Sequence, residues 1–293
     1  MTATRSALDA DWLGACRRAV TGCRRVLAEA PSIEARAVET GTRGSGGDRT
    51  LEIDRSAEAV VLAELAALRG EGHRFVAISE ECGEIDYGDP SVRVIVDPID
   101  GSLNAKRGLP HHALSIAVAD GETMADVAFA FVYDFGPGEE WWARRGEGAW
   151  LDGAPLDPGL GERRGRDGRL ELLGIESADP RWVAASIGAL VDSSYRLRAL
   201  GTIAVSLCQV AAARFDGMVT LRACRGVDAA AGQLIVREAG GLVSFPLCGG
   251  PLGAPLDAQP SSPVVAARSP RTLKELEGVP NRDPGAPQAR VVR

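Results

Sequence analysis

The chain has 293 residues, of which 45% are hydrophobic and 25% charged, with 40 acidic against 33 basic side chains and a formal net charge of −7. That length suffices for one large domain or two modest ones, and an acidic balance without a dense run of Lys and Arg argues against affinity for nucleic-acid or lipid phosphates. No window approaches the roughly 20 consecutive apolar residues of a membrane span, and residues 1–11 lack the apolar core of a secretion signal, so we expect a cytoplasmic protein.

The first part of the chain predicts two helices separated by a loop. Apolar residues recur at helical spacing before Pro31, which ends the first helix. They are Leu13, Cys16, Val20, Cys23 and Leu27. Residues 41–48 are too rich in glycine for regular structure and predict a mobile loop. A second amphipathic helix is expected over residues 56–68.

Short apolar runs bounded by Gly, Pro or acidic residues then predict strands. These runs cover residues 75–78, 92–96, 114–118 and 127–133. Residues 140–150 predict a further strand followed by a turn, and residues 159–168, which mix Gly, Arg, Glu and Asp, predict a linker between two halves.

The second half alternates strands with helices, which predicts helices covering sheets in an α/β or α+β layered architecture. The predicted strands cover 170–174, 195–199, 218–221, 242–245 and 264–267, and the predicted helices 181–191, 202–215 and 228–239. We therefore expect an N-terminal half over residues 1–158 and a C-terminal half over residues 169–279. Residues 280–293 are rich in Pro, Arg and Gly and predict a disordered tail.

The most informative stretch is residues 94–104, where an apolar strand is followed by acidic residues. Asp97 stands at the predicted strand end, Pro98 forces a turn, and Asp100 follows three residues later, so two carboxylates can converge on one point. Mg²⁺ takes oxygen ligands at about 2.1 Å in near-octahedral geometry, which these carboxylates and the carbonyl of Ile99 can supply. The alternative is that the two aspartates only end a strand and cap a turn.

Neighbouring features favour the metal-binding interpretation. Gly101 and Ser102 place backbone N–H groups where an anion can bind. Glu80 and Glu81 follow another apolar strand, and Asp228 stands at the start of an apolar helix. Taken singly, the glutamate pair is typical of a solvated turn and Asp228 of a helix N-cap.

Three motifs in this order resemble the inositol monophosphatase and fructose-1,6-bisphosphatase superfamily of Mg²⁺-dependent, lithium-sensitive phosphatases. They are Ser-Glu-Glu at 79–81, Asp-Pro-Ile-Asp-Gly-Ser at 97–102, and Val-Asp at 227–228 followed by Ala-Ala-Gly at 230–232 and Glu-Ala-Gly-Gly at 238–241. The similarity covers most of the chain and misses only the tail. It implies a five-layer α-β-α-β-α sandwich.

The resemblance also implies a site for two or three Mg²⁺ ions. The metal ligands would be Glu80, Asp97, Asp100, Asp228 and the carbonyl of Ile99, with Glu80 also taking part in catalysis. Glu81 would lie behind these ligands or touch a weaker third ion. Asp54 and the hydroxyl of Ser102 are similar to the pair that orients the attacking water, although Asp54 could equally be only the N-cap of its helix.

Substrate contacts are expected from residues of both halves. They are Gly101, Ser102, Leu103, Gly201, Thr202, Arg222 and Arg225. The two arginines stand where inositol phosphatases commonly carry an acid that binds a ring hydroxyl, and arginines suit a second phosphate. Val227 replaces the usual Trp, Ala105 the usual Phe, and Ser102 the commoner Thr. The pattern looks closer to archaeal-type enzymes that accept both inositol monophosphate and fructose 1,6-bisphosphate.

The sequence therefore predicts a Mg²⁺-dependent phosphomonoesterase that hydrolyses inositol 1-phosphate, fructose 1,6-bisphosphate or both by two-metal activation of water. Its partner would be a small-molecule phosphate ester rather than nucleic acid or a membrane, and we expect a homodimer. Histidinol-phosphate or phosphoadenosine-phosphate hydrolysis remains open, as does a non-catalytic metal- or phosphate-binding protein on the same fold. The presence of both Asp54 and Ser102 favours the enzyme.

Overall fold

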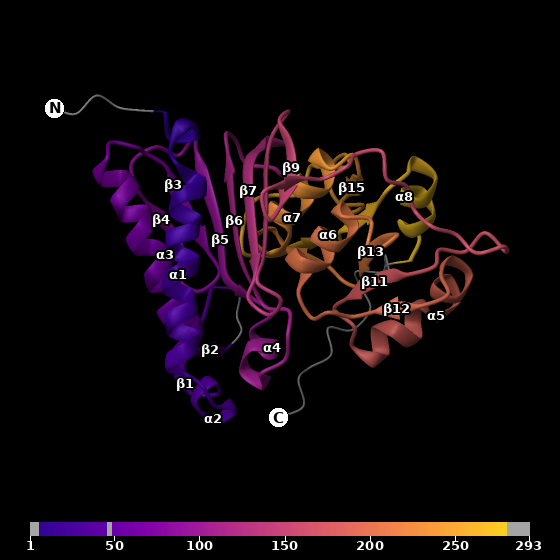
Figure 1. Ribbon diagram of the computed structural model, residues 1–293, viewed down its shortest axis with the longest axis horizontal. Helices are drawn as coiled ribbons and strands as arrows, with labels where there is room; N and C mark the ends of the chain where they lie inside the picture. The colour runs from indigo at the N-terminus through magenta and orange to yellow at the C-terminus, as the bar shows by residue number, and fades with distance from the viewer. Residues whose placement is uncertain (1–5, 46–48, 280–293) are drawn as a thin grey trace.

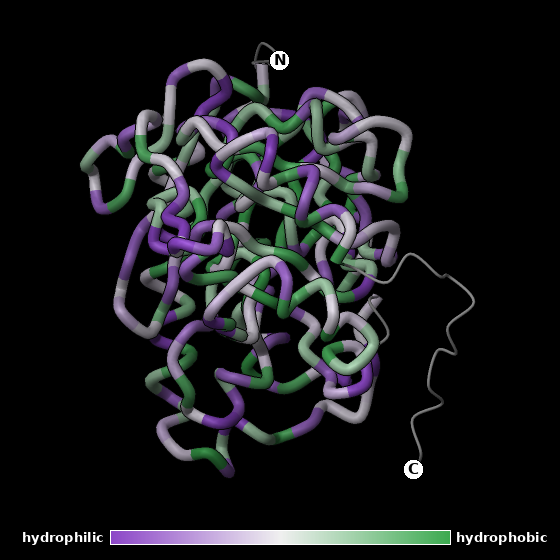
Figure 2. The backbone as a smooth tube through the Cα atoms, turned by 90° about the vertical axis from the view of Figure 1, so that its right-hand side faces the viewer, coloured by the Kyte–Doolittle hydropathy of each residue, from purple (hydrophilic) through white to green (hydrophobic). Residues whose placement is uncertain are grey.

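The computed structural model describes residues 6–45 and 49–279 and arranges them in five layers (Figure 1). An eight-stranded and a five-stranded sheet each lie between two layers of helices, and the middle helical layer is shared by both sheets. This is the mixed α/β, α-β-α-β-α sandwich that the sequence predicted. Hydrophobic residues gather in the interior of the trace and hydrophilic ones along its outer turns (Figure 2).

The first outer layer consists of α1 (Trp12–Glu29) and α3 (Glu52–Gly70), which pack together on the large sheet (Figure 1). The side chain of Asp11 caps α1 by accepting the N–H of Gly14, and the helix ends before Pro31, as predicted. Helix α3 begins four residues earlier than the sequence indicated. None of the helices in the described ranges is long and apolar enough to cross a membrane.

The large sheet is antiparallel except for one pair, β3 with β5. In spatial order it contains β10 (Ala154–Pro155), β9 (Gly148–Leu151), β8 (Glu139–Arg144), β7 (Val127–Asp134), β6 (Ala113–Ala119), β5 (Arg93–Asp100), β3 (Val76–Ser79) and β4 (Gly83–Asp86). Its central strands are continuous apolar runs because helices cover both faces. The sequence missed β4, an edge strand in which Ile85 is the only apolar residue, and β9, which folds back on β8.

The middle layer consists of α6 (Ile203–Ala211) and α7 (Gly226–Glu238), which contact each other and both sheets. Every residue of α7 from Gly226 to Val236 is buried. The two helices approach closely at Gly232, where an added Cβ would lie 2.7 Å from the Cβ of Leu207. Helix α6 ends at Ala211, four residues before its predicted end.

The second sheet and the last outer layer complete the sandwich. In spatial order the sheet contains β12 (Leu197–Arg198), β11 (Leu173–Glu176), β13 (Gly217–Thr220), β17 (Val265–Ala267) and β15 (Leu242–Ser244). Its outer face is covered by α5 (Pro180–Ser193) and α8 (Pro270–Leu276), of which the sequence missed α8. The shorter elements are η1 (Ala7–Asp9), α2 (Ile33–Arg36), β1 (Glu39–Arg43), β2 (Arg49–Leu51), α4 (Ser102–Arg107), η2 (Met124–Asp126), β14 (Cys224–Arg225) and β16 (Pro260–Ser262).

Two local predictions need correction. Residues 41–43 belong to β1, which pairs with β2, so the first part of the expected glycine-rich loop is regular structure. Strand β5 does not stop at Asp97 but continues through Pro98 to Asp100, with a register shift against β6 between the two aspartates. Residues 46–48 and the tail at 280–293 lie outside the described residues. The division into halves at residues 158 and 169 stays a prediction.

Candidate functional site

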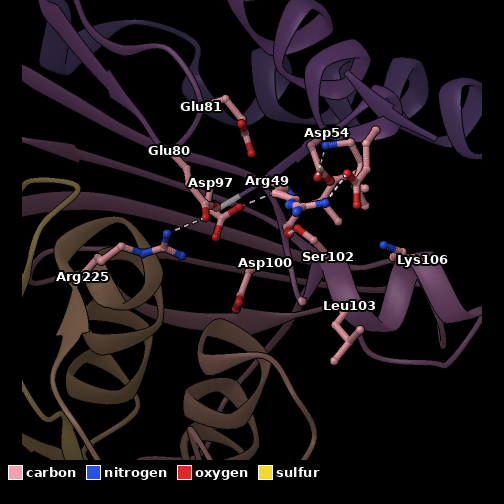
Figure 3. A pocket seen from close by; sticks show the side chains of 14 residues that line it. Arg49, Asp54, Glu80, Glu81, Asp97, Asp100, Ser102, Leu103, Lys106 and Arg225 are labelled. Carbon is pink, nitrogen blue, oxygen red and sulfur yellow. Dashed lines mark hydrogen bonds and ion pairs between the residues drawn. The ribbon is translucent and has the colours of Figure 1, made fainter. Parts of the chain in front are cut away.

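Three carboxylates meet where β3 and β5 approach the start of α7. Figure 3 shows two of them, Glu80 and Asp97, close together. Glu80, Asp97 and Asp228 each place one carboxylate oxygen within 4.8 Å of the others. Asp97 and Asp228 are 1% and 6% exposed. Residues from both halves of the chain therefore form one acidic cluster, although 131 positions separate Asp97 from Asp228.

The register shift in β5 positions the two aspartates of the central motif. Asp97 accepts the N–H of Ile99 at 3.0 Å, which holds its side chain against its own strand. Burial raises the pKa of Asp97 well above its ordinary value, and the charges of Glu80 and Asp100 raise it further. Burial likewise raises the pKa of Asp100 to about 8, and the charge of Asp228 adds to this. Without a cation, this cluster favours protonated carboxyl groups.

Asp100 is held in place by the N-terminal end of α6. One oxygen of its carboxylate accepts both the hydroxyl of Thr202 and the N–H of Ala204, the latter at 2.7 Å. Gly101, which follows, has φ 91°, and an added Cβ would lie 3.1 Å from the carbonyl of Gly201. The close approach of the two segments and the left-handed backbone both require glycine at position 101.

A buried carboxylate that the sequence analysis did not single out holds the turn that carries Glu80 and Glu81. Glu58, on α3, accepts the hydroxyl of Ser79 at 2.5 Å and the N–H of Cys82 at 3.0 Å. These bonds fix the turn between β3 and β4 from both sides. The signal in the sequence was an acidic residue within an apolar helix face, four residues after Asp54.

Asp54 and Ser102, the expected water-orienting pair, line the same cavity. Asp54 is the third residue of α3 and accepts the N–H of Leu51 at 3.3 Å, so it does contribute to the helix start. Its other oxygen is buried and has no hydrogen-bond partner among the described residues. Burial and then the charge of Glu81 raise its pKa to about 7. The hydroxyl of Ser102 donates to the carbonyl of Ile99 at 2.9 Å.

The guanidinium of Arg225 lies among the carboxylates, as Figure 3 shows. It contacts Glu80 at 2.7 Å and Asp228 at 2.9 Å, and the backbone N–H of Arg225 donates to the second oxygen of Asp228 at 3.1 Å. Burial alone would lower the pKa of Arg225, but the two carboxylates hold it above its usual range. Burial raises the pKa of Glu80 to about 7 against the opposing charge of the arginine. The sequence analysis expected Arg225 only as a substrate contact.

Two adjoining cavities extend from this cluster, with volumes of about 370 and 460 Å³. The expected substrate contacts Gly101, Ser102 and Leu103 line the first cavity, and Gly201, Thr202 and Arg222 line the second. Glu81 also lines the first cavity and accepts the hydroxyl of Thr50. Arg225 and Asp100 line both cavities, so the acidic cluster lies at their junction.

A second carboxylate absent from the predicted site shapes the second cavity. Glu176, at the end of β11, is 3% exposed and accepts the N–H groups of Leu200 and Gly201 at 2.8 and 3.0 Å and the hydroxyl of Ser206 at 2.6 Å. Burial raises its pKa to about 7. It fixes the segment that leads to Thr202. Its sequence signal was the same as that of Glu80, an acid directly after an apolar strand.

The chemistry of the side chains fits a hard divalent cation. The cluster offers only carboxylate oxygens, which Mg²⁺ prefers over nitrogen or sulfur. Asp54 lines the same cavity, and its buried oxygen without a hydrogen-bond partner among the described residues can accept a proton or a hydrogen bond from water. Glu80, Asp97 and Asp228 are the residues that could hold the ion, with Asp100 and the carbonyl of Ile99 beside them.

Comparisons of the sequence and of the structure with known proteins agree with one another. The model of the inositol monophosphatase family matches residues 11–279. Nus factor SuhB of Escherichia coli K12 is 37% identical over 211 residues, which are 71% of this chain and 75% of that protein. The fructose-1,6-bisphosphatase/inositol-1-monophosphatase of Thermococcus kodakarensis is 32% identical over 237 residues, 78% of this chain and 82% of that protein. The crystal structure of the extragenic suppressor protein suhB from Bartonella henselae superposes with a TM-score of 0.75 at 25% identity and covers 94% of this chain and all of that one.

Proposed function

Because the chain belongs to the inositol monophosphatase family, we propose that it is a Mg²⁺-dependent phosphomonoesterase acting on inositol 1-phosphate, fructose 1,6-bisphosphate or both. The observation that carries the proposal is the convergence of Glu80, Asp97 and Asp228 within 4.8 Å of one another. Three buried carboxylates at one point repel one another, and the single positive charge of Arg225 does not balance all three, so the cluster still favours a further cation or protons.

Bound Mg²⁺ supplies positive charge to the phosphoryl group and activates water. The remaining roles in the reaction belong to residues of the chain. Asp54 and Ser102 orient the attacking water, and the carboxylate of Asp54, whose pKa is raised to about 7 by burial and by Glu81, takes its proton. The water oxygen forms a bond to phosphorus as the ester P–O bond breaks, and the alcohol leaves with a proton from solvent. The backbone N–H groups after Asp100 bind the phosphoryl oxygens.

The second cavity is the proposed site for the rest of the substrate. Arg222 is exposed at its edge, and Gly201 and Thr202 line it. A guanidinium makes charge-assisted, often bidentate bonds to phosphate and gains less from a neutral hydroxyl. The Thermococcus relative carries both activities in its name, which supports a substrate range that includes a bisphosphate.

A phosphate-release panel in the presence of Mg²⁺ tests the function. It would compare inositol 1-phosphate, fructose 1,6-bisphosphate, histidinol phosphate and phosphoadenosine phosphate. We expect turnover of the first two, with the bisphosphate accepted at least as well as the monophosphate. No release from any substrate would favour a non-catalytic protein on this fold, and a preference for either of the last two would reassign the substrate within the family.

Steady-state kinetics of Arg222→Ala then tests the substrate contact. We expect the KM for the bisphosphate to rise more than the KM for the monophosphate, with kcat little changed for both. Arg196→Ala, an exposed arginine of the same half, is the matched control. Equal effects on both substrates would remove Arg222 from the specificity argument. Light scattering after gel filtration tests the expected homodimer separately.

A further inference from the structure

The acidic cluster already contains a cation of the chain's own. Arg225 contacts Glu80 through one guanidinium nitrogen and Asp228 through two others, at 2.7 to 3.1 Å. The side chains of all three residues are at most 16% exposed. Their contacts are charge-assisted and largely shielded from water, and such contacts are stronger than surface ion pairs.

We propose that Arg225 is an exchangeable internal cation, which neutralises Glu80 and Asp228 before metal binds and must leave them when a divalent cation does. This inference rests on the metal dependence of the proposed function. Oxygen ligands lie about 2.1 Å from Mg²⁺. A metal ion that takes the oxygens now bonded to Arg225 would compete with the guanidinium for the same place, because the two cations repel each other at close range.

The backbone permits this exchange without refolding. Arg225 is the residue directly before α7, and its own N–H is held by Asp228. The main chain is therefore fixed while the guanidinium lies at the end of a stem with several rotatable bonds. Only side-chain torsions need to change, so the exchange requires no rearrangement of the main chain.

The second cavity provides space for the guanidinium of Arg225 after it leaves the carboxylates. Arg225 lines both cavities, and Arg222 lies in the second. An anionic group of the substrate in this cavity could bind the displaced guanidinium and Arg222 together and would offset their mutual repulsion. Metal binding would thus increase the positive charge of the substrate cavity in two ways, through the charge of the metal ion and through the release of Arg225 from the carboxylates.

Direct measurement of metal binding tests the exchange. Mn²⁺, a paramagnetic substitute for Mg²⁺, is titrated into the full chain and its free concentration is followed by electron paramagnetic resonance. We expect Arg225→Ala to bind Mn²⁺ at least tenfold more tightly than the unmodified protein, because the competing cation is gone. Arg225→Lys, which keeps the charge but cannot bridge two carboxylates in the same geometry, should fall between them. Arg196→Ala, an exposed arginine that lines neither cavity, is the matched control and should leave the Mn²⁺ affinity unchanged.

A chemical readout follows the side chain itself. Phenylglyoxal modifies accessible arginines, and mass spectrometry of the peptide containing Arg225 reports the extent of modification. We expect Mg²⁺ to increase the modification of Arg225 in the unmodified protein. Protection of Arg225 by Mg²⁺, or unchanged or weaker Mn²⁺ binding by folded Arg225→Ala and Arg225→Lys, would overturn the inference. Failure of the unmodified protein and every variant to bind Mn²⁺ would instead contradict the metal dependence of the proposed function.

Discussion

The hydroxyl of Thr202 donates a hydrogen bond to the carboxylate of Asp100, a residue that stands 102 positions earlier in the chain. The same carboxylate oxygen also accepts the N–H of Ala204. One of the two oxygens of Asp100 is therefore held by the N-terminal end of α6, so the position of this side chain depends on contact between β5 and α6.

Removal of this hydroxyl should destabilise the protein. We expect Thr202→Val to lower the free energy of unfolding by about 2 kcal/mol, because a hydrogen bond to a charged or buried group and the N-cap of α6 are lost together. Thr202→Ser keeps the hydroxyl and should cost much less. Urea denaturation of the three proteins measures the difference. Destabilisation by Thr202→Ser but not by Thr202→Val would mean that the methyl group, not the hydrogen bond, matters.

Replacement of Asp97, the most buried carboxylate of the acidic cluster, should separate activity from stability. We expect Asp97→Asn to lower kcat by roughly 100-fold or more, because a proposed metal ligand loses its charge. The metal-free variant should be at least as stable as the parent, since the amide relieves repulsion from Glu80 and Asp100. Thermal unfolding with chelator present and phosphate release with Mg²⁺ present provide the two measurements. Asp192→Asn, exposed on α5, is the control. Loss of activity that only follows loss of folded protein would contradict the assignment.

Metal removal should abolish activity and lower the melting temperature. Chelator should stop phosphate release, and added Mg²⁺ should restore it. An ion that binds only the folded state at 100 times its dissociation constant adds about 2.7 kcal/mol to the free energy of unfolding. Differential scanning calorimetry with and without Mg²⁺ checks this. An identical rate and melting temperature in chelator would show that the carboxylates hold no functionally required ion.

Glu176 should impose a pH dependence on stability. Its pKa is raised to about 7 in the folded protein by burial, against an ordinary value of 4.5. Between these values the folded state binds more protons than the unfolded state, so the stability contributed by this group decreases as pH rises from about 4.5 to 7 and is constant outside that range. Relative to Glu176→Gln, the unmodified protein should lose up to about 3 kcal/mol across this interval. Urea denaturation at several pH values gives the difference, and parallel curves for the two proteins would rule out the raised pKa.

The layered fold and the acidic motifs were accessible from the sequence because each rests on a local pattern. Alternating helices and apolar strands predicted the layers, and the family motifs drew attention to Glu80, Asp97, Asp100 and Asp228. The structure brings Glu80, Asp97 and Asp228 together at one point. What the sequence could not give were features decided by packing. Strand β5 continues past Pro98 because its pairing with β6 resumes at Asp100 after a register shift, which no local pattern encodes.

The position of Arg225 in the site is likewise decided by packing and could not be predicted from the sequence. A sequence places an arginine three residues before Asp228, but its rotamer depends on which charges the fold brings within reach. Glu80, from the turn after β3, provides the second carboxylate that draws the guanidinium into the cluster. Glu58 and Glu176 were missed for a related reason: a single acid near apolar residues is common, and only burial with several donors distinguishes these two.

The shared helical layer has a consequence for how the chain tolerates change. Helix α7 has no solvent-facing side between Gly226 and Val236, and both sheets rest on it. A fragment ending before α6 would leave one face of the large sheet without its cover and expose a broad apolar surface that invites aggregation. A substitution in an outer helix therefore needs to fit only the one sheet on which that helix packs. A substitution in the middle layer needs to fit both sheets at once.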